Sequence, residues 1–497
     1  MLRDEGDVIG TERMKLSRRI RISLLITSVV AVMLAIVVAF DLAGGEWSSS
    51  VRYPVNPKWA GTKLGSHRIP PGIHKIKHVV IIMQENRSFD NFFGTFPGAD
   101  GIPMKNGSPA VCVPNPAIHG CTKPFHDRGG IDIGGLHADV SAIQDINGGA
   151  MDGFIRVAEA APEEGCSWPH NDCKTNPLRP DVMGYHDYHE IPNYWAYARH
   201  FVLQDRMFEA TLAPTLPAHL YMVSGWSASC ADLSPLSCRT ETGLQKEIDP
   251  DTSTQPDYRW TDLTYLLAKH GVSWRYYISP HTIPDCDNGI DPSECQPDPA
   301  PTIGTPEQRN PLADFATVHA DHQIGNIEYY PSFFSAAKAG TLASVTWVVP
   351  DLHHSDHPEE PLKNGQAWVT RVINAVMRSP NWKSSAIFLA WDDWGGFYDH
   401  VKPPVVDSVG YGLRVPALVI SPYAKQGFID HQTLSSDAYL KFIEDDFLGG
   451  RRIDPLLDGR PDSRPNVREN APQLGNLVRD FDFHHGPRPP YFLSPHP

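Results

Sequence analysis

The sequence predicts an α/β fold in which helices cover a mainly parallel sheet. Short apolar runs rich in Val, Ile and aromatic residues recur along the chain and are typical of buried strands. These runs span residues 78–83, 273–279, 344–350, 386–391 and 415–421. Between the third and fourth runs, residues 366–379 place Trp368, Val372 and Val376 on one helical face. The order strand, helix, strand indicates parallel pairing, with ligands expected at the carboxyl ends of the strands.

Length and charge narrow the class of protein. The 497 residues suit one elaborated α/β domain. A hydrophobic content of 41% is typical of a globular protein rather than a disordered one. The formal net charge of -15 argues against nucleic acid as a partner, because binding to a phosphate backbone needs a basic face.

The N-terminus carries a membrane-directed signal. The uncharged apolar run at residues 22–40 follows several arginines and a lysine, and as a helix it would span roughly 28 Å, about one hydrocarbon core. The run is longer than the core of an ordinary signal peptide and no Ala-x-Ala site follows it, which favours an uncleaved anchor over a cleaved signal peptide. Positive charge before the run places the bulk of the chain outside the cytoplasm, either anchored or secreted.

The remaining boundaries follow from composition. We expect residues 1–45 to hold the cytoplasmic tail and the anchor or signal peptide, and the Gly-, Ser- and Pro-containing residues 46–75 to form a linker. The main domain is expected at 76–460. Residues 461–497, rich in Pro, Arg and Asp, are expected to be a C-terminal extension.

Cysteine usage supports export. The eight cysteines lie in four sequence-local pairs, each around a short polar loop, and none has the C-x2-C spacing of a zinc site. Eight cysteines allow 105 pairings, so the sequence cannot choose among them, but local disulfides that staple loop insertions are the simplest expectation. The four pairs are Cys112 and Cys121, Cys166 and Cys173, Cys230 and Cys238, Cys286 and Cys295.

Two predicted strands end in ligand-type side chains. The run 78–83 is followed by Glu85 and Asn86, and the run 386–391 by Asp392 and Asp393 and then by glycines. Taken alone, Glu85 and Asn86 are better explained by a helix cap followed by an exposed turn than by metal ligands. Adjacent carboxylates, however, repel each other unless a cation lies between them. Two such strand ends therefore predict a divalent metal site, with Mg, Ca or Mn favoured by the oxygen donors and Zn as the alternative.

A hydroxyl nucleophile is expected between residues 211 and 227. Of the four Ser and Thr hydroxyls in this stretch, Thr215 is distinctive because it lies between Pro214 and Pro217 and before an expected helix, whose N-terminal amides favour phosphate. The alternative is that Thr215 only caps this helix. Two histidine contexts also stand out: His137, and the cluster 351–358 directly after a predicted strand, where a histidine could contact substrate or donate a proton.

The segments together resemble the phosphoesterase family that contains bacterial and plant phospholipases C and secreted acid phosphatases, within the alkaline phosphatase superfamily. The resemblance covers residues 78–449 and implies a three-layer α/β/α sandwich with a catalytic domain at 76–460. The motifs that carry it are HVVIIMQENRSFDNFFGTFPG, NGGAMDGF, APTLPAHLYMVSG, HSDHPEEPLKNGQAWVTRVINAVMRSPNW, AWDDWGGFYDHVKPP and VPALVISPYAKQGFIDH.

The resemblance implies a role for each matching residue. The positions that match the family's metal ligands are Glu85, Asn86, Asp392 and Asp393. Thr215 matches the nucleophile, and His137 and His357 match histidines that line the phosphate site, with His354 as a neighbour. Arg87 and Asp399 then become residues that orient the ligands.

The function implied is metal-dependent hydrolysis of phosphoric esters through a phosphothreonine, of the phospholipase C type and releasing a phosphorylated head group. Acid phosphatase activity on small phosphomonoesters is the alternative. Two departures from the family are present: Pro217-Ala218-His219 replaces the usual Pro-Asn-Arg, and Asp393 replaces the usual Glu. The loss of that arginine gives some support to a third interpretation, a non-catalytic surface binding protein.

Overall fold

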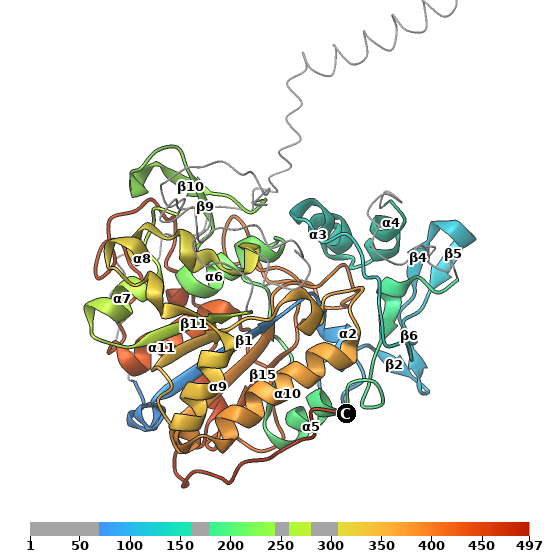
Figure 1. The fold of residues 1–497 in the computed structure, drawn as a ribbon. Helices are drawn as coiled ribbons and strands as arrows, with labels where there is room; N and C mark the ends of the chain where they lie inside the picture. Colours follow the sequence, from blue (N-terminus) through green and yellow to red (C-terminus); the bar gives the residue numbers. More distant parts are fainter. Residues whose placement is uncertain (1–68, 161–177, 244–257, 280–306, 497) are drawn as a thin grey trace, which may run out of the picture. The chain divides into compact units, whose positions relative to one another are not determined.

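The computed structural model describes residues 69–160, 178–243, 258–279 and 307–496. Its centre is an eight-stranded sheet (Figure 1). In spatial order the strands are β12 (Ile327–Tyr329), β11 (Trp274–Ile278), β13 (Val345–Val348), β1 (His78–Gln84), β14 (Ser385–Trp391), β15 (Ala417–Ile420), β8 (Val202–Gln204) and β16 (Phe428–Asp430). The strands from β12 to β14 are mutually parallel, and β15 pairs antiparallel with both of its neighbours. The predicted mainly parallel sheet is thus confirmed, with one reversed strand at 417–420.

Helices cover both faces of the sheet. Residues of β14 alternate between the two faces: the ring of Phe388 stacks on Tyr439 at 4.9 Å, and Trp391 meets Tyr194 edge to face at 5.1 Å. These two partners belong to α11 (Ser436–Phe447) and α5 (Pro192–His200). The helices α9 (Tyr330–Ala339) and α10 (Leu362–Arg378) lie on the α5 side, and α6 (Thr215–Ser224) packs against α11. The expected three-layer α/β/α arrangement is confirmed.

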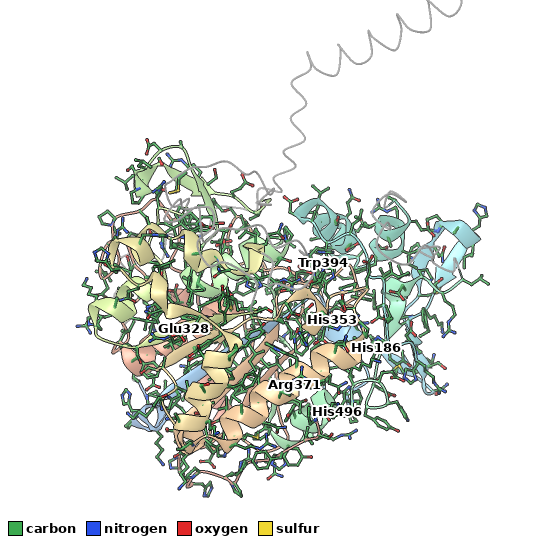
Figure 2. All side chains as sticks on the ribbon, viewed as in Figure 1. His186, Glu328, His353, Arg371, Trp394 and His496 are labelled. Carbon is green, nitrogen blue, oxygen red and sulfur yellow. A yellow bond between two sulfur atoms is a disulfide. The ribbon has the colours of Figure 1, made fainter. Side chains whose placement is uncertain are left out.

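The helix predicted at 366–379 is α10, which starts four residues earlier. Its predicted apolar face is fully covered: Trp368, Val372 and Val376 are buried against the sheet. Lys363 and Arg371 lie on the opposite, exposed side. Figure 2 labels Arg371 on this outer side of the molecule, and Trp394 near the carboxyl end of the central strands.

An insertion between β1 and α5 forms a second, smaller apolar cluster. It contains Phe154, Val182 and Leu413, and it packs on Trp394 directly after β14. Its elements are α2 (Phe89–Phe93), β2 (Met104–Lys105), β3 (Ser108–Pro109), β4 (Val113–Asn115), β5 (Gly120–Thr122), β6 (Phe125–His126), α3 (Asp139–Ile146), α4 (Phe154–Glu159) and β7 (Gly184–Tyr185). The other short elements are β9 (Ala228–Cys230), β10 (Cys238–Thr240), α7 (Leu263–Lys269) and α8 (Ala316–Ala320).

Two of the four expected disulfides lie in the described part of the chain and both are present. Cys112–Cys121 joins the residue before β4 to β5, and Cys230–Cys238 joins β9 to β10. The other four cysteines fall within 161–177 and 280–306, outside the described residues. The expected anchor at 22–40 also lies outside them; among the helices that are described, none is long and apolar enough to cross a membrane. In the C-terminal extension, Leu477 and Phe481 are buried against the core.

Candidate active site

Two neighbouring strands bring the predicted ligands together. β1 and β14 run parallel with Gln84 opposite Trp391, and the backbone of Asp392 donates to the Gln84 carbonyl at 3.0 Å. Glu85 and Asp392 therefore leave the sheet side by side at its carboxyl edge. All four side chains at these strand ends are at most 2% exposed.

Hydrogen bonds to Asp392 and Asp393 fix the position of Asn86. Its backbone N–H donates to Asp392 Oδ1 at 3.0 Å, and its side-chain Nδ2 donates to both oxygens of Asp393 at 3.0 and 3.1 Å. Because a carboxylate accepts hydrogen bonds, the amide nitrogen must face Asp393, which leaves Asn86 Oδ1 as the outward group. Asn86 also has a left-handed backbone with φ 55°, a conformation that short polar residues tolerate and that is often found at functional sites.

Gly395 allows the two strand ends to approach closely. It has φ 61°, and a Cβ at this position would lie 2.5 Å from the carbonyl oxygen of Asn86. The N–H of Gly395 donates to Asp393 Oδ1 at 2.8 Å. The glycine that follows the acidic pair therefore sets the position of the Asp393 carboxylate, which in turn holds the amide of Asn86.

Two residues that the sequence did not single out as ligands complete this group. His219 Nε2 lies 3.4 Å from Glu85 Oε1 and 3.9 Å from Asp392 Oδ2, and Arg309 Nε lies 2.9 Å from Glu85 Oε1. His219 comes from α6, and Arg309 from the 3-10 helix Glu307–Arg309. The sequence marks His219 only as a departure from the family pattern, although its spacing of four from Thr215 on one helical face is a usable signal. Nothing in the irregular sequence before Arg309 indicates its role.

The electrostatics of the group favour a bound cation. Burial raises the pKa of Glu85 to about 6 although Arg309 opposes the rise, and burial together with the charge of Glu85 raises the pKa of Asp392 to about 7. Burial and the charge of Asp392 raise the pKa of Asp393 well above its ordinary value. Glu209, also missed by sequence reasoning, is buried near the two aspartates and has a pKa raised well above its usual range for the same reasons. Four carboxylates this close favour a cation between them.

The atoms at the strand ends fit a divalent metal ion. Glu85 Oε2, Asn86 Oδ1 and Asp392 Oδ2 are buried, and the described residues supply no hydrogen-bond partner for them. One donor atom each from Glu85, His219 and Asp392 lies within 4.8 Å of the others. Burial lowers the pKa of His219 to about 4, so its imidazole is neutral and can offer a lone pair. Two carboxylates, an amide oxygen and one imidazole form a donor set suited to Mn or Zn as well as Mg.

Thr215 lies on the helical face that points at this group. It is the first residue of α6 and is 8% exposed. Residues four apart on a helix share a face, so the hydroxyl of Thr215 lies one turn from His219. Two other hydroxyls in the stretch serve the fold: Ser224 Oγ donates to the Leu220 carbonyl at 2.8 Å, and Ser227 Oγ to the Glu241 carbonyl at 2.7 Å.

The rings of His137 and His357 lie next to each other. The centres of their rings are 6.1 Å apart, in an edge-to-face arrangement. The ring of His137 also lies 6.3 Å from that of Trp394, the residue that follows Asp393 in the sequence. Nδ1 of His357 donates to the Pro358 carbonyl at 2.7 Å, and Nδ1 of His137 donates to the Gly135 carbonyl at 2.9 Å. These bonds fix each ring through Nδ1 and leave Nε2 available to contact a substrate or water. Burial and the charge of Arg309 lower the pKa of His357 to about 3.

Arg87 supports the loops that carry these histidines. It is fully buried, its Nε donates to the Asp356 carbonyl at 2.8 Å, and its Nη1 pairs with Asp132. Asp132 also binds His186 Nε2 at 3.0 Å. Arg87 therefore ties the residue before His357 and the segment before His137 to the end of β1, which is an orienting role rather than contact with the acidic group.

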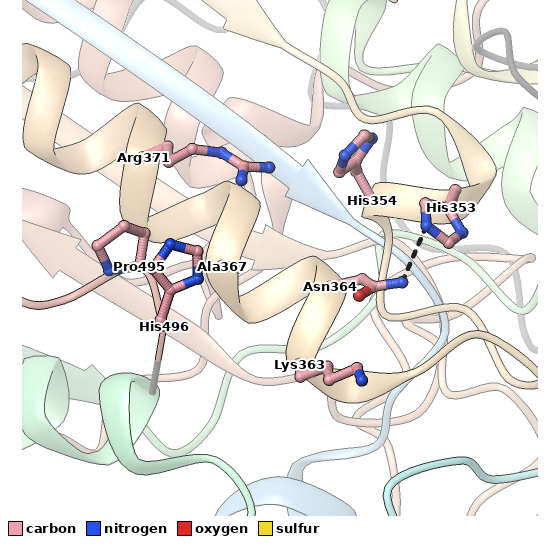
Figure 3. Close-up of a pocket in the computed structure, with 8 residues that line it drawn as sticks. All are labelled: His353, His354, Lys363, Asn364, Ala367, Arg371, Pro495 and His496. Atoms are coloured by element: carbon pink, nitrogen blue, oxygen red, sulfur yellow. Dashed lines mark hydrogen bonds between the residues drawn. The ribbon is translucent and has the colours of Figure 1, made fainter.

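The structure places His354 and Asp399 apart from the acidic group. Nδ1 of His354 lies 2.9 Å from the Asp351 carboxylate, and His354 lines a pocket of about 380 Å³ on the outer side of α10 (Figure 3). The other residues that line this pocket are His353, Lys363, Asn364, Ala367, Arg371, Pro495 and His496. Asp399 is buried and accepts from Arg414 Nε at 2.9 Å and from the Asp90 amide at 3.3 Å. Asp399 therefore stabilises the turn that follows Arg87, and neither of these two bonds reaches a proposed metal ligand.

The chain matches known proteins over the same region. The Phosphoesterase family matches residues 76–448. Phospholipase C A of Mycobacterium tuberculosis is 28% identical over 425 residues, which cover 76% of this chain and 74% of that protein. Non-hemolytic phospholipase C of Burkholderia pseudomallei is 27% identical over 422 residues, covering 75% of this chain and 55% of that protein. Among solved structures, a protein in the alkaline phosphatase superfamily from Vibrio parahaemolyticus matches with 11% identity and a TM-score of 0.34, covering 85% of this chain and 77% of that chain.

Proposed function

The chain belongs to the Phosphoesterase family and is a phosphoric ester hydrolase, and we propose that it is a metal-dependent phosphodiesterase of the phospholipase C type. The observation that carries the proposal is the buried group at the ends of β1 and β14, where Glu85, Asp392 and His219 converge one helical turn from Thr215. The names of its relatives support a phospholipid as the substrate.

The metal would be held by Glu85, Asn86, Asp392 and His219, with Asp393 fixing the amide of Asn86. A divalent ion in this position supplies charge that neutralises phosphoryl oxygens and lowers the pKa of a nearby hydroxyl. This proposal differs from the sequence expectation in two residues: His219 joins the ligands, and Asp393 becomes an orienting residue.

Catalysis would proceed by two displacements at phosphorus. Thr215 Oγ loses its proton to water and attacks phosphorus, the bond to the leaving alcohol breaks, and His137 Nε2 protonates that alcohol. Water then attacks phosphorus of the phosphothreonine and gives a proton to His137, and the bond from phosphorus to the Thr215 oxygen breaks. That oxygen takes back a proton from water as the phosphorylated head group leaves. We assign proton transfer to His137 because burial lowers the pKa of His357 to about 3, so His357 stays neutral and its Nε2 can accept a hydrogen bond from water.

The non-catalytic alternative loses its main support. It was based on the absence of the family's usual arginine at position 219, but His219 is buried within the acidic group and offers a neutral nitrogen to it. A change from arginine to histidine here alters the donor set and leaves a group that can still bind metal.

The test compares two substrates and two variants. Wild type with phosphatidylcholine vesicles is expected to release phosphocholine, and Thr215→Ala to lose turnover on the order of 10³-fold or more. Thr370→Ala is the matched control, since Thr370 is also a buried helical threonine but lies in α10. Mass spectrometry of enzyme quenched with acid during turnover of phosphatidylcholine should find phosphocholine on Thr215.

The outcomes separate the candidate functions. Turnover of a simple aryl phosphate without any head-group release would replace the phospholipase assignment with acid phosphatase activity on phosphomonoesters. Full activity in Thr215→Ala would remove the phosphothreonine mechanism, whichever substrate is used.

We also propose an extracytoplasmic location, through anchoring or secretion directed by residues 22–40. The two disulfides in the described part of the chain support it, because such bonds persist in oxidising compartments. Fractionation of cells that express the full chain, followed by N-terminal sequencing, would distinguish anchored from cleaved protein; recovery of the chain in the cytosol with reduced cysteines would overturn the proposal.

A further inference from the structure

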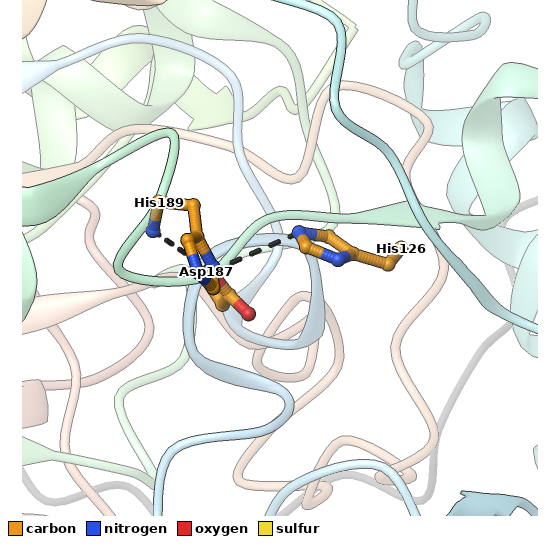
Figure 4. A group of neighbouring side chains, drawn as sticks. All are labelled: His126, Asp187 and His189. Carbon is orange, nitrogen blue, oxygen red and sulfur yellow. Dashed lines mark hydrogen bonds and ion pairs between the residues drawn. The ribbon is translucent and has the colours of Figure 1, made fainter.

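A second group of metal-ligand side chains lies outside the active site, at the base of the insertion. It consists of His126 at the end of β6 and of Asp187 and His189 in the turn before α5, which each bring one donor atom within 4.8 Å of the others. Glu190 joins the group through its Oε2, which lies 2.8 Å from His126 Nε2. Figure 4 shows the Asp187 carboxylate between the rings of His126 and His189. The two histidines come from distant segments of the sequence, so the fold and not local sequence brings them together.

The distances between donor atoms in this group are close to those around a bound metal ion. Asp187 Oδ1 lies 3.7 Å from His126 Nε2 and 2.6 Å from His189 Nδ1, and Glu190 Oε2 lies 2.8 Å from His126 Nε2. Donor atoms around a tetrahedral ion with bonds near 2 Å are about 3.3 Å apart. These three pairs therefore need shifts of under about 1 Å to reach that spacing, which side-chain rotation supplies.

Its surroundings hold the group in place and leave it open to solvent. β6 pairs with β7, and the His126 ring stacks on Tyr185 at 5.6 Å with an angle of 5°. The side chains of Asp187 and Glu190 are 18% and 11% exposed, whereas His189 is 56% exposed. One wall is thus fixed by the fold, and the exposed histidine can swing to admit an ion.

We infer that His126, Asp187, His189 and Glu190 form a second site for a divalent transition metal, for which Zn²⁺ is the best match. Two imidazoles and two carboxylates are the donor set that zinc accepts with four ligands. Calcium and magnesium favour all-oxygen sites and are disfavoured by two nitrogen donors. This site is distinct from the one at the strand ends, because it shares none of its residues.

The alternative is that the two acids serve only the local turn. Asp187 Oδ1 accepts the His189 amide at 2.8 Å, and Glu190 Oε2 accepts the Asp187 amide at 3.2 Å. These bonds explain the acids but not His126, whose ring arrives from another strand and points its Nε2 at both carboxylates. The His126 imidazole is not needed to hold the turn, but it would supply a further ligand to a metal ion bound by the two carboxylates.

The site has a structural consequence for the insertion. The residues next to it, Asp127 and His186, are joined by a bond of 3.1 Å between the Asp127 carbonyl and His186 Nδ1. His186 then binds Asp132, and Asp132 pairs with Arg87. A zinc ion would thus fasten β6 to the turn before α5 at the point where the insertion connects to the end of β1.

The test counts zinc in the full-length protein. Wild type, His126→Ala/His189→Ala and His270→Ala are dialysed against micromolar Zn²⁺ and measured by inductively coupled plasma mass spectrometry. His270 is the matched control because it is exposed and belongs to no metal-ligand group among the described residues. We expect the double variant to hold one zinc fewer per chain than wild type, and the control to hold the same number as wild type.

Thermal unfolding supplies the second readout. Added Zn²⁺ at about 100 times the dissociation constant should raise the Tm of wild type by about 3 °C more than that of the double variant. His189→Ala alone, at an exposed position, should also lose most of this difference, which guards against misfolding of the double variant.

The outcomes are separate from those for ester hydrolysis. Equal zinc counts and equal Tm shifts in wild type and the double variant would overturn the second site and leave only a hydrogen-bonded turn. Thr215→Ala should keep the second zinc, so a failure of the proposed hydrolysis leaves the zinc count as an independent result.

Discussion

His219 Nε2 lies 3.4 Å from Glu85 Oε1, although the two residues come from α6 and from the end of β1. Both side chains are fully buried, and burial lowers the pKa of His219 to about 4. A neutral imidazole does not neutralise a carboxylate, so their proximity is better explained by a shared ligand than by an ion pair. The contact therefore links the helix that carries Thr215 to the proposed metal.

His219→Ala is expected to weaken divalent metal binding by about 10–100-fold or more, since even residues that only support metal ligands give losses of this size. Competition with a chromophoric chelator measures the affinity directly, without reference to activity. His270→Ala, which removes an exposed histidine, should bind metal as wild type does. An unchanged affinity in His219→Ala would show that the imidazole is not a ligand.

The sequence was sufficient to predict five of the eight strands of the sheet, the helix α10 and both strand ends of the candidate site. The three short strands β12, β8 and β16 were not predicted. Buried parallel strands are continuous apolar runs, and a polar residue where such a run stops has to lie at the sheet edge. This is why Asn86 and Asp392 could be paired across 306 residues, although neither motif is specific alone.

The parts that could not be predicted depend on side-chain direction or on irregular chain. The sequence predicts Asp393 as a ligand, but the left-handed turn at Asn86 makes it a hydrogen-bond acceptor for that residue. His354 lies in a short 3-10 helix shortly before His357, and its ring faces the outer side of α10. Arg309 reaches Glu85 from a Pro- and Asp-rich stretch in which no periodicity indicates direction.

Gly395→Ala is expected to lower the free energy of unfolding by more than the cost of a left-handed alanine alone. A left-handed alanine costs about 1 kcal/mol, and a Cβ at this position also lies 2.5 Å from the Asn86 carbonyl oxygen, which overpacking data suggest costs about 1–3 kcal/mol more. Metal affinity should fall as well, because Asn86 would have to move.

Gly271→Ala is the matched control for this prediction. Gly271 also has a positive φ, 67°, but a Cβ added there would meet no other described atom within 4 Å. Urea unfolding should therefore show a loss of about 1 kcal/mol for Gly271→Ala, and metal titration should show no change. Equal losses in the two variants would mean that the contact with Asn86 is unimportant.

Asp132 is expected to make stability depend on pH below about 4. Burial disfavours its charged form, but the charges and hydrogen bonds of His186 and Arg87 overcome burial and hold the pKa of Asp132 well below its ordinary value. A carboxyl with a lowered folded-state pKa contributes stability above its unfolded value, near 3.9, and loses that contribution as the pH falls toward the folded value.

The measurement is the difference in free energy of unfolding between wild type and Asp132→Asn from pH 6 to pH 3. Removing one partner of a buried pair costs about 3–5 kcal/mol, and this difference should shrink as the pH falls below about 4. A difference that grows toward acid would contradict the assignment of Asp132 as the charged partner of Arg87.

Asp392→Asn is expected to change stability in opposite directions with and without metal. Burial and the charge of Glu85 raise the pKa of Asp392 to about 7, above its unfolded value near 3.9. A raised carboxyl pKa means that ionisation disfavours the folded state, so at pH 8 the neutral amide should stabilise the metal-free protein by roughly 1–3 kcal/mol. With metal the carboxylate is a ligand, so the variant should lose the stabilisation that metal gives wild type.

The control for this reversal is Asp407→Asn. Asp407 is also buried, but burial is outweighed by Arg468, which lowers the pKa of Asp407, and the two are joined by hydrogen bonds of 2.7 and 2.8 Å. Removing this charge leaves Arg468, among the described residues, with only the longer ion pair to Asp437, at 3.8 Å. The change should destabilise the protein by about 3–5 kcal/mol, with or without metal. Calorimetric unfolding of wild type and both variants in chelator and in excess divalent ion gives the six values needed. If Asp392→Asn destabilises the metal-free protein as Asp407→Asn does, then the carboxylates at the strand ends are compensated within the chain, and the argument for a cation between them fails.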